Sequence, residues 1–271
     1  MDIFGIVNIT DDSFSDGGKY LQIEEAQKKA LELYNEGADV IDLGAQSSNV
    51  DANWIEPEIE WKRLRPMITF LQEKSIRVSV DTFKPAVIRS SIEAGVSFIN
   101  NINAFQDEES LAILQEYKNQ LPELILMYSH SNLFKARKKS YLSPETIMDT
   151  ILSFFEKRFE TLLRANIPLR KCIIDPGMGF FLGEDPELSF TVLRNIHRFK
   201  EAFGRVMVSV SRKSFLGTIL GGLAPLERKN ASLATELYLY EKKVDYIRTH
   251  EVKPLWEGMK VLQYIRGKSN G

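Results

Sequence analysis

Polar residues of several chemical kinds stand at the ends of short apolar runs along the sequence. Carboxylates, amides, a methionine with a tyrosine, a lysine, an arginine and a histidine are represented, namely Asn8, Asp42, Asp81, Asn100, Met127, Tyr128, Asp175, Lys213, Arg248 and His250. Any one of them, taken alone, could be a residue at the rim of the fold whose hydrogen bonds are already made. A polar group that faces an interior needs a partner, however, and several that converge define a site. The set therefore predicts a binding site that is built from many segments.

Two of these segments are suited to a negatively charged group. Arg248 and His250 are two residues apart in a predicted strand, so their side chains point the same way, and both can donate hydrogen bonds. The run Ser211-Arg212-Lys213-Ser214 opens a predicted helix, and a helix amino terminus with basic side chains is a general anion site. A basic first turn that faces solvent explains the second run equally well when it is taken alone.

The elements that would carry these residues alternate between strand and helix. Apolar, β-branched runs predict eight buried parallel strands, at Ile3–Thr10, Val40–Gly44, Arg77–Thr82, Phe98–Ile102, Leu124–Ser129, Cys172–Gly177, Arg205–Ser211 and Tyr246–His250. Between them lie helical patterns. One runs from Glu24 to Gly37, which would cap it, with one face made of Ala26, Ala30, Leu33 and Tyr34. Another is predicted to begin at Ser143-Pro144, a serine cap followed by a proline at the first helical position.

Such alternation is compatible with a closed barrel or with an open, doubly wound sheet. Eight strand–helix units in about 250 residues match the usual size of the barrel. No linker rich in Gly, Ser and Pro divides the 271 residues. The sequence therefore predicts one α/β domain over residues 1–271, a single (β/α)8 TIM barrel, in which the active site forms at the carboxyl ends of the strands.

Composition argues against several classes of partner. The formal net charge of −2, from 35 basic and 37 acidic residues, gives no overall attraction for nucleic acid or for an anionic membrane surface. The single cysteine, Cys172, lies in an apolar run and is expected to be a core residue, which favours a reducing, cytoplasmic setting. No secretory signal is visible, and no stretch approaches the roughly 18 apolar residues of a membrane span.

Long motifs carry a family resemblance over essentially the whole chain. The string at residues 6–18, Ile-Val-Asn-Ile-Thr-Asp-Asp-Ser-Phe-Ser-Asp-Gly-Gly, resembles the first signature of the dihydropteroate synthases. Val80-Asp81-Thr82, Ile99-Asn100, Asp175-Pro176-Gly177-Met178-Gly179-Phe180, Ser211-Arg212-Lys213-Ser214 and Arg248-Thr249-His250 are similar to the later motifs of that family, in the same order. The resemblance implies a pterin-binding barrel that condenses a pterin pyrophosphate with para-aminobenzoate, with Mg²⁺ arriving on the pyrophosphate.

The resemblance also implies roles for individual residues. The pterin would be bound by Asp81, Asn100, Met127, Asp175, Phe180 and Lys213. The pyrophosphate would be held by Asn8, Arg248 and His250, with Asn8 as the metal contact. The para-aminobenzoate would lie against Ser48, Phe180, Phe181, Arg212 and Ser214. Asp81, Lys213, Arg248 and His250 would act in catalysis, mainly by stabilising the leaving group and the charge that grows on the pterin.

The sequence departs from the family pattern after the second strand and after Gly179, and the resemblance implies that the second of these stretches borders the para-aminobenzoate pocket. After the second strand, the usual Glu-Ser-Thr-Arg-Pro-Gly becomes Gln46-Ser47-Ser48-Asn49-Val50-Asp51, without the arginine. After Gly179, the longer apolar run Phe180-Phe181-Leu182-Gly183 is similar to the sulfonamide-resistant Sul-type enzymes. An added ring can obstruct a drug that extends beyond the substrate's volume, so we expect sulfonamides to be at most weak competitors. Ordinary variation in loop length remains the alternative.

Two other functions stay open at this stage. A methyltransferase that uses methyltetrahydrofolate would share Asp81, Asn100 and Asp175 but would not need the anion-binding groups. A pterin-binding protein without catalysis is compatible with the altered loop after the second strand. The family commonly forms homodimers through helices late in the chain, to which Leu237-Tyr238-Leu239-Tyr240 could contribute an apolar surface.

Overall fold

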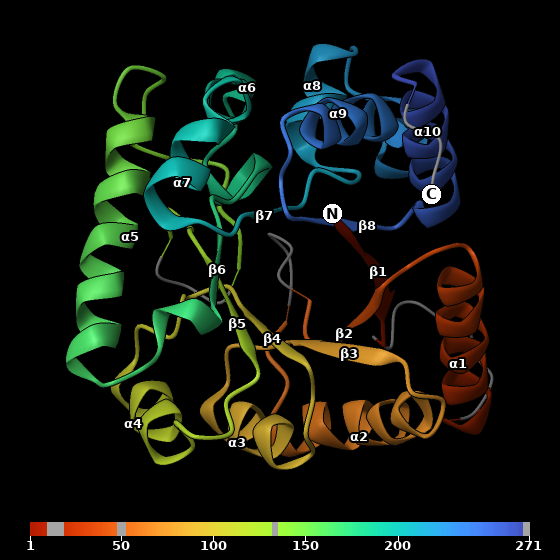
Figure 1. Cartoon of the computed structure of the whole chain (residues 1–271), viewed down its shortest axis with the longest axis vertical. Helices are drawn as coiled ribbons and strands as arrows, with labels where there is room; N and C mark the ends of the chain where they lie inside the picture. The colour runs from red at the N-terminus through yellow and green to blue at the C-terminus, as the bar shows by residue number, and fades with distance from the viewer. Residues whose placement is uncertain (10–18, 48–52, 132–134, 268–271) are drawn as a thin grey trace.

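The computed structural model of the chain describes residues 1–9, 19–47, 53–131 and 135–267. Its strands form one parallel sheet in the order β6-β5-β4-β3-β2-β1-β8-β7. The strands are β1 (Asp2–Asn8), β2 (Val40–Gly44), β3 (Arg77–Asp81), β4 (Phe98–Asn101), β5 (Glu123–Met127), β6 (Cys172–Asp175), β7 (Met207–Val208) and β8 (Tyr246–Thr249). Figure 1 shows the helices arranged around these strands. The predicted TIM barrel is confirmed.

The barrel is closed least firmly between β6 and β7. There the two edges meet at one isolated bridge, which pairs Ile174 with Val206, and the Ile174 amide donates to the Arg205 carbonyl at 3.0 Å. The predicted strand Arg205–Ser211 is accordingly wrong in length, since only Met207–Val208 pairs as a strand. The residues beyond Val208 leave the ladder and pass toward the start of α8.

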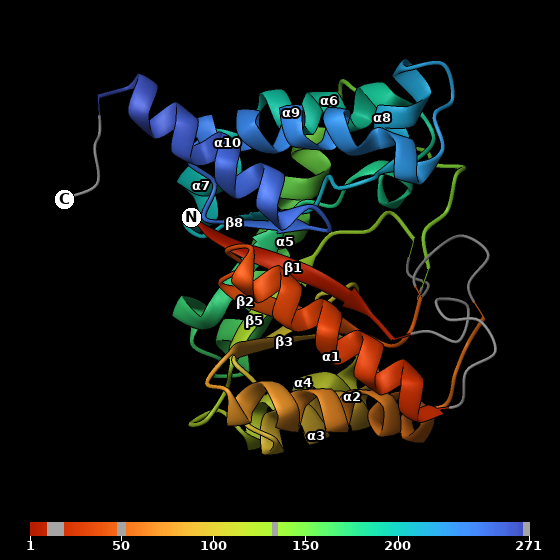
Figure 2. The ribbon, with the colours of Figure 1, turned by 90° about the vertical axis from the view of Figure 1, so that its right-hand side faces the viewer.

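The helices and short 3-10 turns follow the strands in chain order. They are α1 (Lys19–Asn35), α2 (Pro57–Glu73), α3 (Pro85–Glu93), α4 (Glu108–Glu116), α5 (Ile147–Arg164), η2 (Leu169–Lys171), η3 (Gly179–Phe181), α6 (Pro186–Arg194), α7 (Ile196–Phe203), α8 (Ser214–Ile219), η4 (Pro225–Arg228), α9 (Lys229–Glu241) and α10 (Val252–Ile265). Figure 2 shows α8, α9 and α10 on one side of the strands and α2 and α3 on the other. None of the helices in the described ranges is both long and apolar enough to cross a bilayer.

Several predicted boundaries differ from those observed. The strand ends predicted at Thr82, Ile102, Ser129, Gly177 and His250 lie one or two residues too far, because the chain stops pairing where it enters the loops. The predicted end at Thr10 lies outside the described residues. Helix α5 begins at Ile147, three residues after the predicted proline, because Ser143 to Thr146 form a turn first. Tyr34 is 42% exposed and does not share the buried face of α1.

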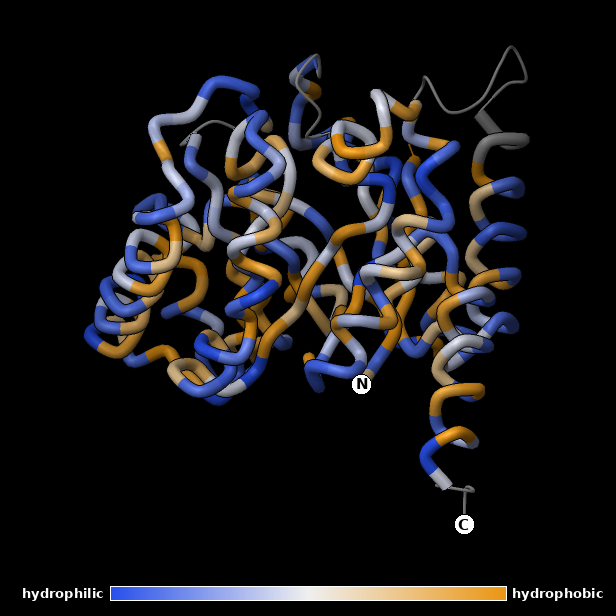
Figure 3. Tube along the Cα trace, turned by 90° about the horizontal axis from the view of Figure 1, so that it is seen from above, coloured by the Kyte–Doolittle hydropathy of each residue, from blue (hydrophilic) through white to orange (hydrophobic). Residues whose placement is uncertain are grey.

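Two groups of side chains make up most of the core. Inside the barrel, Phe4, Val40, Phe98, Ile125, Ile173 and Met207 form one cluster, against which Tyr246 packs. A much larger cluster lies between the strands and the helices. It includes Cys172, which is buried as predicted, and burial raises the pKa of its thiol to about 12. Figure 3 shows hydrophobic stretches through the middle of the molecule and many hydrophilic residues on the outer turns of the helices.

Candidate active site

The inner face of the barrel changes from apolar to polar within two residues. Val40, Phe98, Ile173 and Tyr246 belong to the inner apolar layer, and two positions later in the same strands stand Asp42, Asn100, Asp175 and Arg248. Side chains two positions apart in a strand point to the same face. The polar residues therefore form a second layer directly above an apolar floor, at the carboxyl ends of the strands.

A cavity of about 770 Å³ opens above this second layer. Nine of the residues that the sequence singled out line it, namely Asn8, Asp81, Phe180, Phe181, Arg212, Lys213, Ser214, Arg248 and His250. Asn100, Met127 and Asp175 lie next to it in the strands and are buried, with 5%, 8% and 2% exposure. Ser48 lies outside the described residues. The remaining predicted site residues are thus brought to one end of the barrel.

Arg248 is bound by two carboxylates from strands that are distant in sequence. Its Nε donates to Asp42 at 2.6 Å, and its Nη2 donates to Asp81 at 2.7 Å. Burial opposes the charge of Arg248, but the two carboxylates outweigh burial and raise its pKa. Asp42 is fully buried, whereas Asp81 faces the cavity with its side chain 29% exposed. Arg248 is therefore fixed across the mouth of the barrel, and its Nη1 makes no hydrogen bond to the described residues.

Three groups in the mouth titrate near neutral pH. Burial raises the pKa of Asp81 to about 7, against the opposing effect of Arg248. Burial also raises the pKa of Asp175 to about 6, although its Oδ1 accepts a hydrogen bond from the Gly177 amide at 2.9 Å. Burial lowers the pKa of Lys213 to about 8. A ligand that brings charge or hydrogen bonds into the mouth will therefore shift these protonation equilibria.

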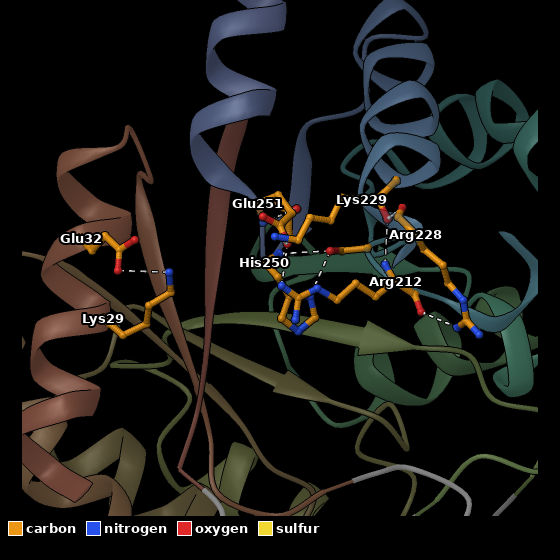
Figure 4. A network of polar contacts seen from close by, with 10 residues as sticks. Lys29, Glu32, Arg212, Arg228, Lys229, His250 and Glu251 are labelled. Carbon is orange, nitrogen blue, oxygen red and sulfur yellow. Dashed lines mark hydrogen bonds and ion pairs between the residues drawn. The ribbon is translucent and has the colours of Figure 1, made fainter. Parts of the chain in front are cut away.

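His250 stands in a positively charged environment. Its Nδ1 lies 3.0 Å from the Ser211 hydroxyl, and burial together with Arg212, Arg248 and Lys213 lowers its pKa to about 3. Figure 4 shows Arg212 and Glu251 beside the His250 ring. The imidazole is thus neutral at physiological pH, while the nearby cations favour an anion at this place.

The position of Arg212 is fixed by several contacts. Its guanidinium binds Glu251 at 2.5 Å, its amide donates to the Ser232 hydroxyl at 2.9 Å, and its carbonyl accepts from Arg228 at 2.8 Å (Figure 4). The backbone at Arg212 has a φ of +60°, which is unusual for a residue with a Cβ. Arg212 lines the cavity, but its charge is directed to Glu251.

An apolar wall stands beside the polar layer. Met127, Ile102, Ala136 and Phe181 form a buried cluster, against which Phe180 and Phe83 pack. The Lys213 ammonium lies 4.3 Å from the centroid of the Phe181 ring. The turn that carries the two phenylalanines lies close to α8. A Cβ built on Gly179, where φ is +63°, would lie only 2.9 Å from the Ser214 hydroxyl, so a glycine is needed there. The cavity therefore has one polar and one aromatic side.

Asn8 is the described residue that best fits a contact to a metal ion carried by a substrate. It is exposed at the end of β1 and lines the cavity, and its Oδ1 would lie 3.4 Å from a Cβ built on Gly44. In the described part of the chain, His, Cys, Asp and Glu side chains do not gather in groups of three or more that could hold a metal ion. An amide oxygen is a ligand that Mg²⁺ accepts, and this ion commonly keeps waters and substrate phosphates as its other ligands.

The sequence did not assign a role to Asp42, Glu251, Gln46 or Lys84. Asp42 was recognised as a strand-end residue, but its contact with Arg248 joins residues 206 positions apart. One sequence signal could have identified Glu251, because it is an acidic residue that directly follows the Arg248–His250 motif. Nothing in the sequence pattern marks Lys84, which is 1% exposed and binds Glu60 at 2.6 Å.

Comparison with known proteins gives one consistent result. A model of the family described as pterin binding enzyme matches residues 4–250. A dihydropteroate synthase type-3 from Escherichia coli is 46% identical over 96% of this chain and 97% of its own length. A solved structure of the Xanthomonas albilineans dihydropteroate synthase with 4-aminobenzoic acid is 29% identical, with a TM-score of 0.87, and the match covers 98% of this chain and 93% of that one.

A second structure of the Xanthomonas albilineans enzyme, in complex with 7,8-dihydropteroate, is 28% identical, with a TM-score of 0.83 and the same coverage of both chains. The family match begins within β1 and covers the other seven strands completely, and the relatives match along nearly their whole length. By its sequence, its fold and the residues at the mouth of its barrel, the chain belongs to the pterin binding enzymes, among the dihydropteroate synthases.

Proposed function

We propose that the chain is a dihydropteroate synthase of folate biosynthesis, formed by one domain over residues 1–271. It joins the amino group of para-aminobenzoate to the methylene carbon of 6-hydroxymethyl-7,8-dihydropterin pyrophosphate and releases pyrophosphate. The observation that carries this proposal is the convergence of Asp81, Lys213, Arg248 and His250 on one cavity, above the buried Asp175. The relative that is 46% identical is named dihydropteroate synthase type-3.

The pterin would lie against the polar layer and the aromatic wall. With a pKa of about 6, Asp175 is mostly ionised at neutral pH, so its carboxylate can accept paired hydrogen bonds from a pterin edge. The Oδ1 of Asn100 is buried and makes no hydrogen bond within the described ranges, which suits it to a ring donor. Asp81 and Lys213 would serve the remaining polar atoms, with Met127 and Phe180 as apolar contacts.

The leaving pyrophosphate would lie near His250 and Arg248. As the aniline nitrogen forms its bond to the methylene carbon, the carbon–oxygen bond breaks, pyrophosphate takes the electron pair, and the nitrogen loses a proton. His250 and the Nη1 of Arg248 can donate hydrogen bonds to the anion, and the positive environment that lowers the pKa of His250 favours its charge. Asp81 would stabilise positive charge that develops on the pterin.

The Mg²⁺ ion would be a companion of the pyrophosphate, with Asn8 as its contact from the protein. The ion would supply neutralisation of the phosphate charge. Asn8 fits this role because it is exposed at the cavity and lies at the same end of the barrel as Arg248 and His250.

The para-aminobenzoate would occupy the outer part of the cavity. Phe180, Phe181, Arg212 and Ser214 line the cavity and would contact this substrate, and Ser48 would complete the set. Phe180 packs against the buried cluster that contains Phe181, and both rings would limit the room for a ligand larger than para-aminobenzoate. We expect sulfonamides to compete weakly for this reason. Sulfonamide inhibition constants equal to those of a sensitive dihydropteroate synthase, with unchanged para-aminobenzoate affinity, would refute the expectation.

The enzyme would act in the cytoplasm as a homodimer. Tyr238 on α9 and Trp256, Val261 and Tyr264 on α10 are exposed, with 36%, 42%, 57% and 74% exposure. Exposed apolar side chains on these two late helices suit a contact between two copies of the chain, to which Leu239 does not contribute because it is fully buried. Sedimentation velocity at micromolar concentration tests the dimer directly.

The deciding experiment measures product formation from both substrates beside binding of the pterin alone. Turnover supports the synthase, pterin binding without turnover indicates a binding protein, and methyl transfer from methyltetrahydrofolate indicates the methyltransferase. Lys213→Ala should lose pterin affinity, and it should be compared with Lys118→Ala, an exposed lysine that follows α4. A fully active Lys213→Ala variant would contradict the role of Lys213.

A further inference from the structure

The segment that follows β2 is held at both ends by one side chain, Gln46. Its Nε2 donates to the Ser47 carbonyl and to the Asn53 carbonyl, both at 2.8 Å. Its Oε1 accepts from the Ile55 amide at 3.0 Å. Ser47 and Asn53 flank residues 48–52, which lie outside the described ranges, so a single amide group sets the distance between the two ends.

The buried ammonium of Lys84 binds Gln46 and the segment around it. The Lys84 ammonium donates to the Gln46 Oε1 at 3.2 Å and to the Ile55 carbonyl, and it binds Glu60 of α2 at 2.6 Å. Lys84 and Glu60 have side-chain exposures of 1% and 0%. A buried ammonium needs acceptors in addition to its counter-charge. Two of those acceptors belong to the segment after β2, so the ion pair and the segment stabilise each other.

The contacts of Gln46 in this chain use both the nitrogen and the oxygen of its amide. Gln46 donates twice to carbonyl oxygens and accepts twice, from an amide and from an ammonium. A carboxylate has the same shape but has no donor, so its oxygen would face two carbonyls. It would also add a second negative charge beside the buried pair, which Lys84 and Glu60 already balance. Glutamine is therefore specifically suited to this position.

Gln46 and Ser47 line the same cavity as Phe180, Phe181 and Ser214. Gln46 and Ser47 thus form part of one side of the cavity. We propose that Gln46, supported by Lys84 and Glu60, is a positioning residue that fixes this side for para-aminobenzoate. The proposal rests on the synthase function, and it assigns Gln46 no part in pterin binding or in the departure of pyrophosphate.

The test compares Gln46→Glu with Gln46→Met, which removes the polar contacts without adding charge. Gln72→Glu is a matched control, because the Gln72 Nε2 also donates to two backbone carbonyls, at 2.7 and 3.2 Å, but on α2 away from the cavity. We expect both Gln46 variants to raise the KM for para-aminobenzoate by about tenfold or more, the equivalent of one or two hydrogen bonds. The KM for the pterin pyrophosphate and kcat should stay within about twofold, and Gln72→Glu should change neither KM.

Melting curves identify the folded variants, and Gln46→Met decides the test if Gln46→Glu does not fold. An unchanged KM for para-aminobenzoate in folded Gln46→Met overturns the proposal. An equal rise in both KM values, or a loss of kcat alone, also overturns it, because either result indicates a general structural role. Failure of the synthase function is distinguishable, since the wild type would then show no turnover and would not bind 4-aminobenzoate in calorimetry.

Discussion

Asp42→Asn isolates the contribution of one buried carboxylate to the mouth of the barrel. Asp42 is fully buried, and its Oδ2 accepts from the Nε of Arg248 at 2.6 Å. Removing one partner of a buried ion pair costs about 3–5 kcal/mol. Arg248 keeps its contact with Asp81, so we expect a smaller loss of unfolding free energy, about 2 kcal/mol. Reversible urea denaturation measures this value.

The same variant should change the pH dependence of activity. The charge of Asp42 helps to raise the pKa of Asp81, which burial brings to about 7. Replacing Asp42 by a neutral residue therefore lowers the pKa of Asp81, and any acid limb of kcat/KM that reports Asp81 moves to lower pH. A loosened Arg248 should also lower kcat/KM.

Asp2→Asn is the matched control. Asp2 forms an ion pair with Arg77 at 2.9 Å in the same barrel, but the two side chains are 35% and 47% exposed. Exposed pairs contribute about 0–1 kcal/mol, and Asp2 is remote from the cavity. Equal stability losses in Asp42→Asn and Asp2→Asn, with identical pH profiles, would refute the argument that Asp42 holds Arg248 in place.

Three further variants test other parts of the structure. Gly37→Ala should lower the unfolding free energy by about 1–3 kcal/mol in urea titrations, because φ is +108° and the new Cβ would lie 2.5 Å from the Trp256 ring; unchanged stability would contradict this contact. Burial raises the pKa of Glu236 from 4.5 to about 7, so its contribution to stability is present below pH 4.5 and is lost as the pH rises through 7. At about 1.4 kcal/mol per pKa unit, Glu236→Gln should remove a penalty of about 3 kcal/mol at pH 8 and change little at pH 5; melting curves of both proteins across that range check the sign. Gly217→Ala should raise the KM for para-aminobenzoate, because the new Cβ would lie 2.3 Å from the Arg228 Nε and would displace the guanidinium that binds the Arg212 carbonyl. Steady-state kinetics equal to those of the wild type would exclude this coupling.

The fold could be predicted from the sequence because local patterns specify it. The β-branched runs at Val40–Gly44 and Phe98–Ile102 begin where β2 and β4 begin. The ends of the strands could not be predicted in the same way. A strand ends where its neighbours stop pairing with it, and the sequence of one segment does not determine where its neighbours end. The short β7 illustrates this, because an apolar run of seven residues contains only two that pair as a strand.

The gathering of these polar residues at one end of the barrel could also be predicted, but their contacts could not. Asn8, Lys213 and His250 line one cavity, because carboxyl ends of parallel strands meet at one face. The partners of Arg248 and Lys84 depend on the curvature of the barrel and on burial, and neither is encoded by spacing along the chain. Residues that meet only after the sheet closes leave no local pattern.

The join between β6 and β7 has a consequence for the motion of the whole barrel. The other neighbouring strands are paired by ladders of two to five residues, whereas this join depends on Ile174 and Val206. Asp175 immediately follows one side of it, and the chain reaches Lys213 soon after the other. We expect local opening of the barrel to begin at this join. The rate of amide hydrogen exchange at Ile174 would measure how often the join opens, and therefore how rigidly Asp175 and Lys213 are held.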